Sequence, residues 1–366
     1  MRDLNFGFIG IGLIGGSIAK TLRKIYPNCT VAVYNRNELA RKLAASDGTA
    51  NITTDKVDKN FSNCDYIFLC TPVEKNIEYL SSLKQIIKND CIITDVGSVK
   101  GNIHAAVKKL GLESNFIGGH PMAGSEKTGY ENSNDHLLEN AYYAITPTDE
   151  VSSEYVDEYK QIVKDMGALP LIISPDEHDH VVATISHLPH IIASSLVNLV
   201  KDNDSEKEYM KTIAAGGFKD ITRIASSSPE MWEQICMTNG ENISKMLQMY
   251  INSLENIKTE VDKSDSKAIY EMFKDGKDYR DNIENRTNGI ISNHYILYCD
   301  IIDESGAIAT IATILSTNGV NIKNIGIVHN REFEDGVLRI SFYEKEDADK
   351  AFEQLEKHKY SVTKRY

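Results

Sequence analysis

The sequence predicts an α/β protein with a doubly wound, mostly parallel sheet, followed by an all-helical domain and a small βαββαβ domain. Three observations support this prediction. Short apolar runs alternate with helical patterns over residues 1–173, helical patterns alone fill residues 174–285, and strands return over residues 294–366. Strand and helix alternation is typical of parallel sheets. At 366 residues the chain is long enough for two or three domains.

Seven apolar runs mark the expected strands of the first domain. They are LNFGFIG, TVAVYN, DYIFLCTP, CIITDVGS, NFIGGHP, AYYAITP and LPLIIS. Ligands of open α/β sheets bind beyond the carboxyl ends of the strands, so residues that follow these runs are candidates for a site.

The helical domain begins after Ser174. No proline occurs after Pro229, so the helices there can run without interruption. A polar cluster of Asn, Arg and Gly at 282–293 predicts a linker. Beyond it the order strand, helix, strand, strand, helix, strand is the ferredoxin-like arrangement.

Composition excludes several classes of function. The net charge of −13 argues against nucleic acids or an anionic membrane as partners, because both require basic patches. No apolar run approaches the ~20 residues of a membrane span, and the chain opens on a strand-like segment, which predicts a cytoplasmic protein. The six cysteines form no CxxC pair and the histidines form no HExxH pattern, so we expect reduced cysteines and no metal site.

A glycine pattern predicts a dinucleotide site. Gly10-Ile-Gly12-Leu13-Ile14-Gly15 follows the first apolar run and opens a helical pattern. Gly10 permits a tight turn, Gly12 lets the backbone approach a pyrophosphate, and Gly15 allows close helix packing. The N-terminus of the helix would attract the phosphates. The alternative is a merely structural glycine turn.

The choice between NAD and NADP stays open. Asn35 stands where an NAD site usually has a carboxylate for the ribose, and Arg36 beside it could pair with a 2′-phosphate. An arginine at a strand end is more often only solvated, so we expect NAD, with NADP possible. Thr71 and Pro72, at the end of DYIFLCTP, complete the expected cofactor-binding set.

His120 is the candidate catalytic base. It follows the run NFIGG, while Ser98 and Lys100 follow CIITDVG, so all three should reach the same edge of the sheet. The pKa of a free histidine is ~6.5, which suits removal of a hydroxyl proton during hydride transfer. The alternative is a histidine that only satisfies a carbonyl group in a turn.

The helical domain carries the candidate substrate groups. Ser186 and His190 lie four residues apart, so they share one helix face. Arg223 presents paired donors that match a carboxylate, and Asp220 could hold its guanidinium in place. The alternative for the second pair is an ordinary surface ion pair.

Five blocks together resemble the prephenate dehydrogenase family of tyrosine biosynthesis: GLIGGSIA, DVGSVK, GGHPMAGSEKTG, SHLPHIIA and GGFKDITRIASSSPEMW. The resemblance implies a Rossmann domain, a helical domain that builds a homodimer, and a C-terminal ACT regulatory domain. The implied reaction converts prephenate and NAD(P)+ to 4-hydroxyphenylpyruvate, CO2 and NAD(P)H.

The resemblance also implies residue roles. His120 would bond and deprotonate the ring hydroxyl, with Ser98 beside it. Arg223 would bind a substrate carboxylate, and Glu126 and Asp220 would form an ionic network with it. The implied substrate-binding residues are Arg223, His190, Ser186, Glu126 and Asp220.

The ACT-like segment implies tyrosine as an effector. Ser305 stands where proline is common in that family, while Gly306 and Asn321 match it. The implied effector residues are Gly306, Ala307, Asn321 and Ile322. The alternative is a domain that serves only assembly. Regulation would require a second ligand site whose ligand binds the two states of the protein with different affinity.

Three rival functions remain at this stage. Arogenate dehydrogenase differs only by an amine on the substrate side chain. A β-hydroxyacid dehydrogenase of the 6-phosphogluconate type would need a catalytic lysine where this chain has Ser186 to His190. A non-catalytic cofactor sensor would not require His120, Ser98 and Arg223 together.

Overall fold

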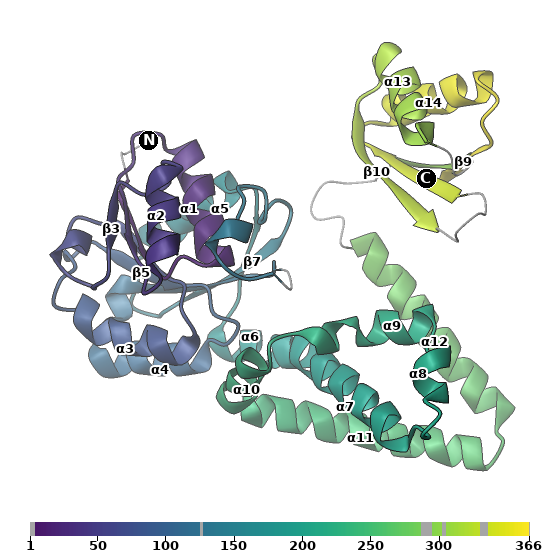
Figure 1. Ribbon diagram of the computed structural model, residues 1–366, viewed down its shortest axis with the longest axis horizontal. Coiled ribbons are helices and arrows are strands. Elements are labelled where there is room, and N and C mark those ends of the chain that lie inside the picture. The colour runs from purple at the N-terminus through teal and green to yellow at the C-terminus, as the bar shows by residue number, and fades with distance from the viewer. Residues whose placement is uncertain (1–3, 125–126, 287–294, 302–304, 330–335, 366) are drawn as a thin grey trace. The chain divides into compact units, whose positions relative to one another are not determined.

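The computed structural model describes residues 4–124, 127–286, 295–301, 305–329 and 336–365 (Figure 1). The chain forms two compact units, Met1–Thr259 and Glu260–Tyr366. The division into three domains at 173 and at 285 to 294 stays a prediction. Residues 287–294, which hold most of the predicted linker, and Glu126 lie outside the described residues.

The first unit is built on one eight-stranded sheet with the order β3-β2-β1-β4-β5-β6-β7-β8. The strands are β1 (Phe6–Ile9), β2 (Val31–Tyr34), β3 (Ile52–Thr54), β4 (Tyr66–Leu69), β5 (Ile92–Asp95), β6 (Phe116–Pro121), β7 (Tyr142–Pro147) and β8 (Leu169–Ile172). All neighbours are parallel except β6 and β7. The strand order reverses beside β1, which confirms the doubly wound Rossmann-type class. The sequence prediction missed β3, whose residues Ile-Thr-Thr lack an apolar run.

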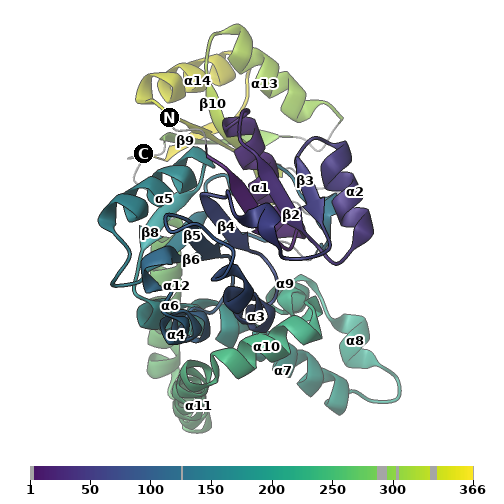
Figure 2. The same ribbon diagram turned by 90° about the vertical axis from the view of Figure 1, so that its left-hand side faces the viewer.

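Helices cover both faces of this sheet (Figure 2). They are α1 (Leu13–Ile25), α2 (Glu38–Ser46), α3 (Val73–Leu83), α4 (Gly101–Leu110) and α5 (Ser153–Asp165), with short turns η1 (Lys59–Phe61), η2 (Glu113–Asn115) and η3 (Tyr130–Asn132). Ile18 and Leu22 of α1 are buried in one core, and Ile103 and Val107 of α4 are buried in the other. Because helices cover both faces, β1, β2, β4 and β5 are buried along their whole length, which explains their continuous apolar runs.

The rest of the first unit is helical and begins after Ser174. The Ser174 hydroxyl accepts the Glu177 N–H, and Pro175 stands in the first turn, where it needs no donor. The elements are α6 (Pro175–Val182), a π-helical turn η4 (Ala183–His187), α7 (Leu188–Asn203), α8 (Tyr209–Ile213), α9 (Gly216–Thr222), η5 (Arg223–Ser226), α10 (Pro229–Thr238) and α11 (Gly240–Asp262).

Many large apolar side chains of these helices are exposed in the single chain. Leu199, Ile213 and Met237 are 60%, 74% and 73% exposed. The stretch Pro175–Asn203 is also long and apolar enough to cross a membrane, a test that a core helix of a soluble protein passes as well. Apolar surface of this kind is typical of an interface with another protein chain.

The second unit contains α12 (Ser266–Arg286) and a four-stranded antiparallel sheet with the order β10-β11-β9-β12. Its other elements are β9 (Tyr295–Ile301), α13 (Ala307–Thr317), β10 (Ile322–His329), β11 (Gly336–Phe342), α14 (Lys345–Lys357) and β12 (Val362–Arg365). Leu297 and Leu338 of the sheet are fully buried with Ile311 and Leu355 of the two helices. The predicted ferredoxin-like arrangement is confirmed.

Candidate active site

The turn between β1 and α1 has the shape that the glycine pattern predicts. Gly10 adopts φ +93°, which favours glycine, and a Cβ there would lie 2.6 Å from Thr71 Cγ2. A Cβ on Gly15 would lie 2.7 Å from the Gly10 carbonyl oxygen. A Cβ on Gly12 would meet no described atom within 4 Å, so space is open at the N-terminus of α1. These residues fit a dinucleotide, because the backbone can approach a pyrophosphate there and the helix N–H groups would attract it.

Replacing Gly12 with valine should weaken binding of NAD, the predicted cofactor, by about tenfold or more, because the side chain would occupy the space of the pyrophosphate. Gly12 has φ −96°, which any residue can adopt, so the melting temperature should stay close to that of the wild type. Gly15→Ala should instead lower the melting temperature, since its Cβ would press on the Gly10 carbonyl. Calorimetric titration and thermal unfolding measure the two effects, and a destabilised Gly12→Val with unchanged NAD affinity would contradict the assignment.

Asn35 lies just beyond β2, where a ribose-reading residue is expected. Its Nδ2 donates to the Ile11 carbonyl oxygen of the glycine turn at 3.3 Å. Arg36 is exposed beside it. Thr71 and Pro72 follow β4, the other neighbour of β1. The structure therefore brings the predicted cofactor residues together around the carboxyl end of β1.

A buried ion pair holds the main chain next to His120. The Lys100 ammonium donates to the Asp95 carboxylate and, at 2.6 Å, to the Gly119 carbonyl oxygen, while Asp95 Oδ1 accepts the Gly119 N–H at 3.2 Å. Burial lowers the pKa of Lys100, and the Asp95 carboxylate opposes that effect. Lys100 was expected at the edge of the sheet with Ser98, but the structure buries it completely. Ser98 lies in the loop between Asp95 and Lys100. The hydrogen bonds of this ion pair to Gly119 therefore hold the Ser98 loop to the residue that precedes His120.

The imidazole of His120 contacts a second histidine. Its Nδ1 lies 2.8 Å from His178 Nε2, and His178 Nδ1 lies 2.8 Å from Asp179 Oδ1. Burial is the main cause that lowers the pKa of His120 well below 6.5, and the neighbouring Lys100, His178 and His187 lower it further. A lowered pKa favours the neutral imidazole, which is the form that a general base needs.

His178 was not predicted as a partner of His120. The histidines lack an HExxH pattern, so no metal role was expected for them, and no other role was predicted for His178. The signal was present in the adjacent pair His178-Asp179, which stands in the first helix after the sheet.

A π-helical turn shapes the second half of the site. The Ser186 carbonyl oxygen accepts from His190 Nδ1 at 2.9 Å, and the His190 ring stacks on Trp232 with centroids 3.8 Å apart. Burial is the main cause that lowers the pKa of His190; the hydrogen bond to the Ser186 carbonyl oxygen opposes this effect, and the positive charge of Arg223 adds to it. Arg223 and Asp220 are exposed where α9 meets η5. Single π turns are frequent at functional sites.

His187 is a core histidine. It is 1% exposed, and its Nδ1 accepts from Asn239 Nδ2 at 3.2 Å. Burial lowers the pKa of His187 from 6.5 to about 4.

This histidine should make the fold sensitive to acid. As the pH falls, an unfolded histidine binds a proton near pH 6.5, whereas folded His187 binds one only near pH 4. The contribution of His187 to the free energy of unfolding is therefore fully present above about pH 6.5 and is lost as the pH falls toward 4. The expected contribution is about 2 kcal/mol of unfolding free energy lost between pH 7 and pH 5. Urea unfolding at both values measures it, and His187→Gln should reduce the difference by that amount. An unchanged difference would contradict the role.

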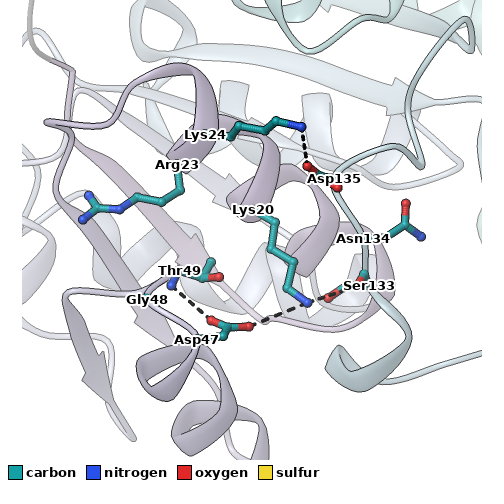
Figure 3. Close-up of a pocket in the computed structure, with 9 residues that line it drawn as sticks. All are labelled: Lys20, Arg23, Lys24, Asp47, Gly48, Thr49, Ser133, Asn134 and Asp135. Carbon is teal, nitrogen blue, oxygen red and sulfur yellow. Dashed lines mark hydrogen bonds and ion pairs between the residues drawn. The ribbon is translucent and has the colours of Figure 1, made fainter.

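A pocket of about 500 Å³ on the first unit is not part of this site (Figure 3). It is lined near the C-terminal end of α1, which points away from the carboxyl edge of the sheet because α1 runs antiparallel to β1. Its Lys20 donates to the Ser133 carbonyl oxygen at 3.0 Å, and its Lys24 pairs with Asp135 at 2.7 Å. These cations hold the surrounding loops together.

The predicted effector residues lie in the second unit. Gly306 has φ +96° and directly precedes α13, which begins at Ala307. Asn321 and Ile322 follow the other end of that helix, where β10 begins. Because α13 has 11 residues, or about 16 Å, one chain does not bring the four residues together.

Comparisons with known proteins add to this geometry. Two family models match the chain, "Prephenate dehydrogenase, nucleotide-binding domain" over residues 18–171 and "Prephenate dehydrogenase, dimerization domain" over residues 174–275. The prephenate dehydrogenase of Bacillus subtilis (strain 168) is 37% identical over 349 residues, which cover 95% of this chain and 94% of that protein. The crystal structure of prephenate dehydrogenase from A. aeolicus in complex with hydroxyphenyl propionate and NAD+ superposes with a TM-score of 0.73 at 33% identity, over 77% of this chain and 99% of that one. Synechocystis arogenate dehydrogenase superposes with a TM-score of 0.70 at 26% identity, over 76% of this chain and 100% of that one.

Proposed function

The chain belongs to the prephenate dehydrogenase family, and on that premise we propose that it converts prephenate and NAD+ to 4-hydroxyphenylpyruvate, CO2 and NADH. The observation that carries the proposal is the position of His120 on β6, at the carboxyl edge of the sheet that also holds the glycine turn. A base and a dinucleotide site on one edge suit the removal of a proton and a hydride from one carbinol group.

His120 takes the proton of the substrate hydroxyl in this proposal. NAD+, when bound, supplies the acceptor for the hydride. The backbone at Gly12 and the N-terminus of α1 hold its pyrophosphate, and Asn35 faces its ribose. Ser98 lies in the loop between Asp95 and Lys100, which hydrogen-bond to Gly119, the residue before His120, and its hydroxyl would share the hydrogen bond of the substrate.

The carboxylates of prephenate are assigned to the helical part of the unit. Arg223 binds one of them, because a guanidinium offers two parallel donors to a carboxylate. His190 contacts the substrate, held by the Ser186 carbonyl oxygen. Asp220 and Glu126 complete the ionic network around Arg223. Glu126 lies outside the described residues, so its assignment comes from the resemblance alone.

Steady-state kinetics with prephenate and arogenate, each with NAD and with NADP, test the proposed function. We expect the highest kcat/KM for prephenate with NAD. A higher kcat/KM for arogenate would change the assigned substrate but not the assigned reaction, because the two molecules differ only in an amine or keto group remote from the ring hydroxyl. No turnover of either compound would contradict the function and would favour a non-catalytic cofactor sensor.

Two further assignments concern assembly and regulation. We propose a homodimer formed through the helical elements, which is supported by their exposed Leu199, Ile213 and Met237. Sedimentation of the protein measures it. We also propose that the second unit is an ACT domain that binds tyrosine beside Gly306 and Ala307, and inhibition by tyrosine that Gly306→Val abolishes would support this.

A further inference from the structure

His120 is the first member of a hydrogen-bonded row of three side chains. His178, 2% exposed, lies behind it on α6, and the two rings meet edge to face with centroids 5.1 Å apart. Asp179, 5% exposed, lies behind His178 at 2.8 Å. The row begins on β6 and ends on α6, the helix that follows the last strand of the sheet.

The polarity of this row follows from Asp179. Its Oδ1 accepts the Lys100 N–H and its Oδ2 accepts the Gly101 N–H, both at 2.8 Å, at the start of α4. Backbone N–H groups can only donate, so both carboxylate oxygens act as acceptors. The bond between Asp179 Oδ1 and His178 Nδ1 therefore requires the proton on His178 Nδ1.

The next bond then has a defined direction as well. A neutral histidine with its proton on Nδ1 carries a lone pair on Nε2. In the neutral form of this row, His178 Nε2 accepts and His120 Nδ1 donates to it. A neutral His120 with its proton on Nδ1 presents its lone pair at Nε2, on the far side of the ring from His178.

We propose that His178, held by Asp179, is a positioning residue that keeps the proton of His120 on Nδ1 and leaves Nε2 as the base that faces the substrate. The role concerns the reaction of the proposed function and rests on it. When the substrate O–H bond breaks and the Nε2–H bond forms, His120 becomes an imidazolium that still donates from Nδ1 to His178. The carboxylate of Asp179 lies behind this positive charge and stabilises it.

Kinetics of two variants at His178 test the proposal. In His178→Leu we expect kcat with prephenate and NAD to fall about 100-fold, while both KM values stay within about threefold, because substrate and cofactor contact other residues. In His178→Gln the amide nitrogen can donate to Asp179 and the oxygen can accept from His120, so we expect kcat within about tenfold of the wild type. Asp179 itself is unsuitable for substitution, since it also caps α4.

A matched control is available on the same helix. His180 is exposed, so His180→Leu should leave kcat unchanged and should report any general effect of the substitution on α6. The proposal is overturned if His178→Leu keeps kcat within about threefold of the wild type, or if His178→Gln loses as much activity as His178→Leu.

Nitrogen-15 NMR of the full chain labelled at histidine gives a second readout that needs no turnover. We expect His120 to carry its proton on Nδ1 in the wild type and in His178→Gln, and to show a mixture of tautomers in His178→Leu. A wild-type His120 protonated on Nε2 would overturn the proposal. If the wild type does not oxidise prephenate, the proposed function fails, whereas this spectrum still decides the positioning role separately.

Discussion

Replacing His120 with asparagine is expected to lower kcat with prephenate and NAD by about 10²- to 10⁴-fold, the usual contribution of a general base. Asparagine places an amide nitrogen close to the position of Nδ1, so it can keep the bond to His178 while it removes the titrating Nε2. The affinity for NAD should stay within about twofold, because the glycine turn belongs to other strands of the sheet.

The same substitution at an exposed histidine provides the control for this prediction. His136 has 62% of its side chain exposed and pairs with the surface carboxylates of Asp135 and Glu139, so His136→Asn should leave kcat unchanged. Single-turnover measurements separate the chemical step from product release. Turnover of His120→Asn within tenfold of the wild type would refute the role of His120 as the base.

Replacing Arg223 with alanine should mainly raise the KM for prephenate. A hydrogen bond between charged groups contributes about 1.5 to 3 kcal/mol, which corresponds to an increase of about 10- to 150-fold. Since the guanidinium binds a carboxylate that takes no part in hydride transfer, kcat should change much less. The KM for NAD should be unaffected.

Two further variants give the comparison for Arg223. Arg223→Lys keeps the charge but loses the paired donors, so its KM should lie between those of the wild type and the alanine variant. Lys219→Ala removes an exposed cation from α9, the helix that ends just before Arg223, and should leave the KM unchanged. An equal increase in both alanine variants would show a general effect of charge and not a specific contact.

In the first unit, some structural features could be predicted from short stretches of sequence and others could not. The glycine pattern predicted a tight turn at Gly10 and a backbone at Gly12 that a pyrophosphate can approach; in the structure Gly10 has φ +93° and a Cβ on Gly12 would meet no described atom within 4 Å. Such features depend on backbone sterics and on neighbours a few residues away, so they are present in a short stretch of sequence. The strand β3 was not predicted, because its three residues, Ile-Thr-Thr, are too few to show the alternation of apolar and polar side chains that marks a strand.

The burial of Lys100 could not be predicted from its neighbours in the sequence. A lysine that follows a strand is ordinarily solvated, and only the pairing of β5 with β6 places an Asp95 carboxylate and a Gly119 carbonyl around it. Burial of such a charge is costly unless it is paired, so these contacts could form only once both strands were in place.

The sequence by itself predicted seven of the eight strands of the first sheet, the dinucleotide turn and His120 as the candidate base, because periodicity and the chemistry of single side chains are local properties. Only the tertiary structure decided what stands behind that histidine. His178 is 58 residues away along the chain, and its distance to His120 depends on how α6 packs against the edge of the sheet. Hydrogen-bond direction in such a row depends on every partner at once, so the protonated nitrogen of His120 follows from the assembled network alone.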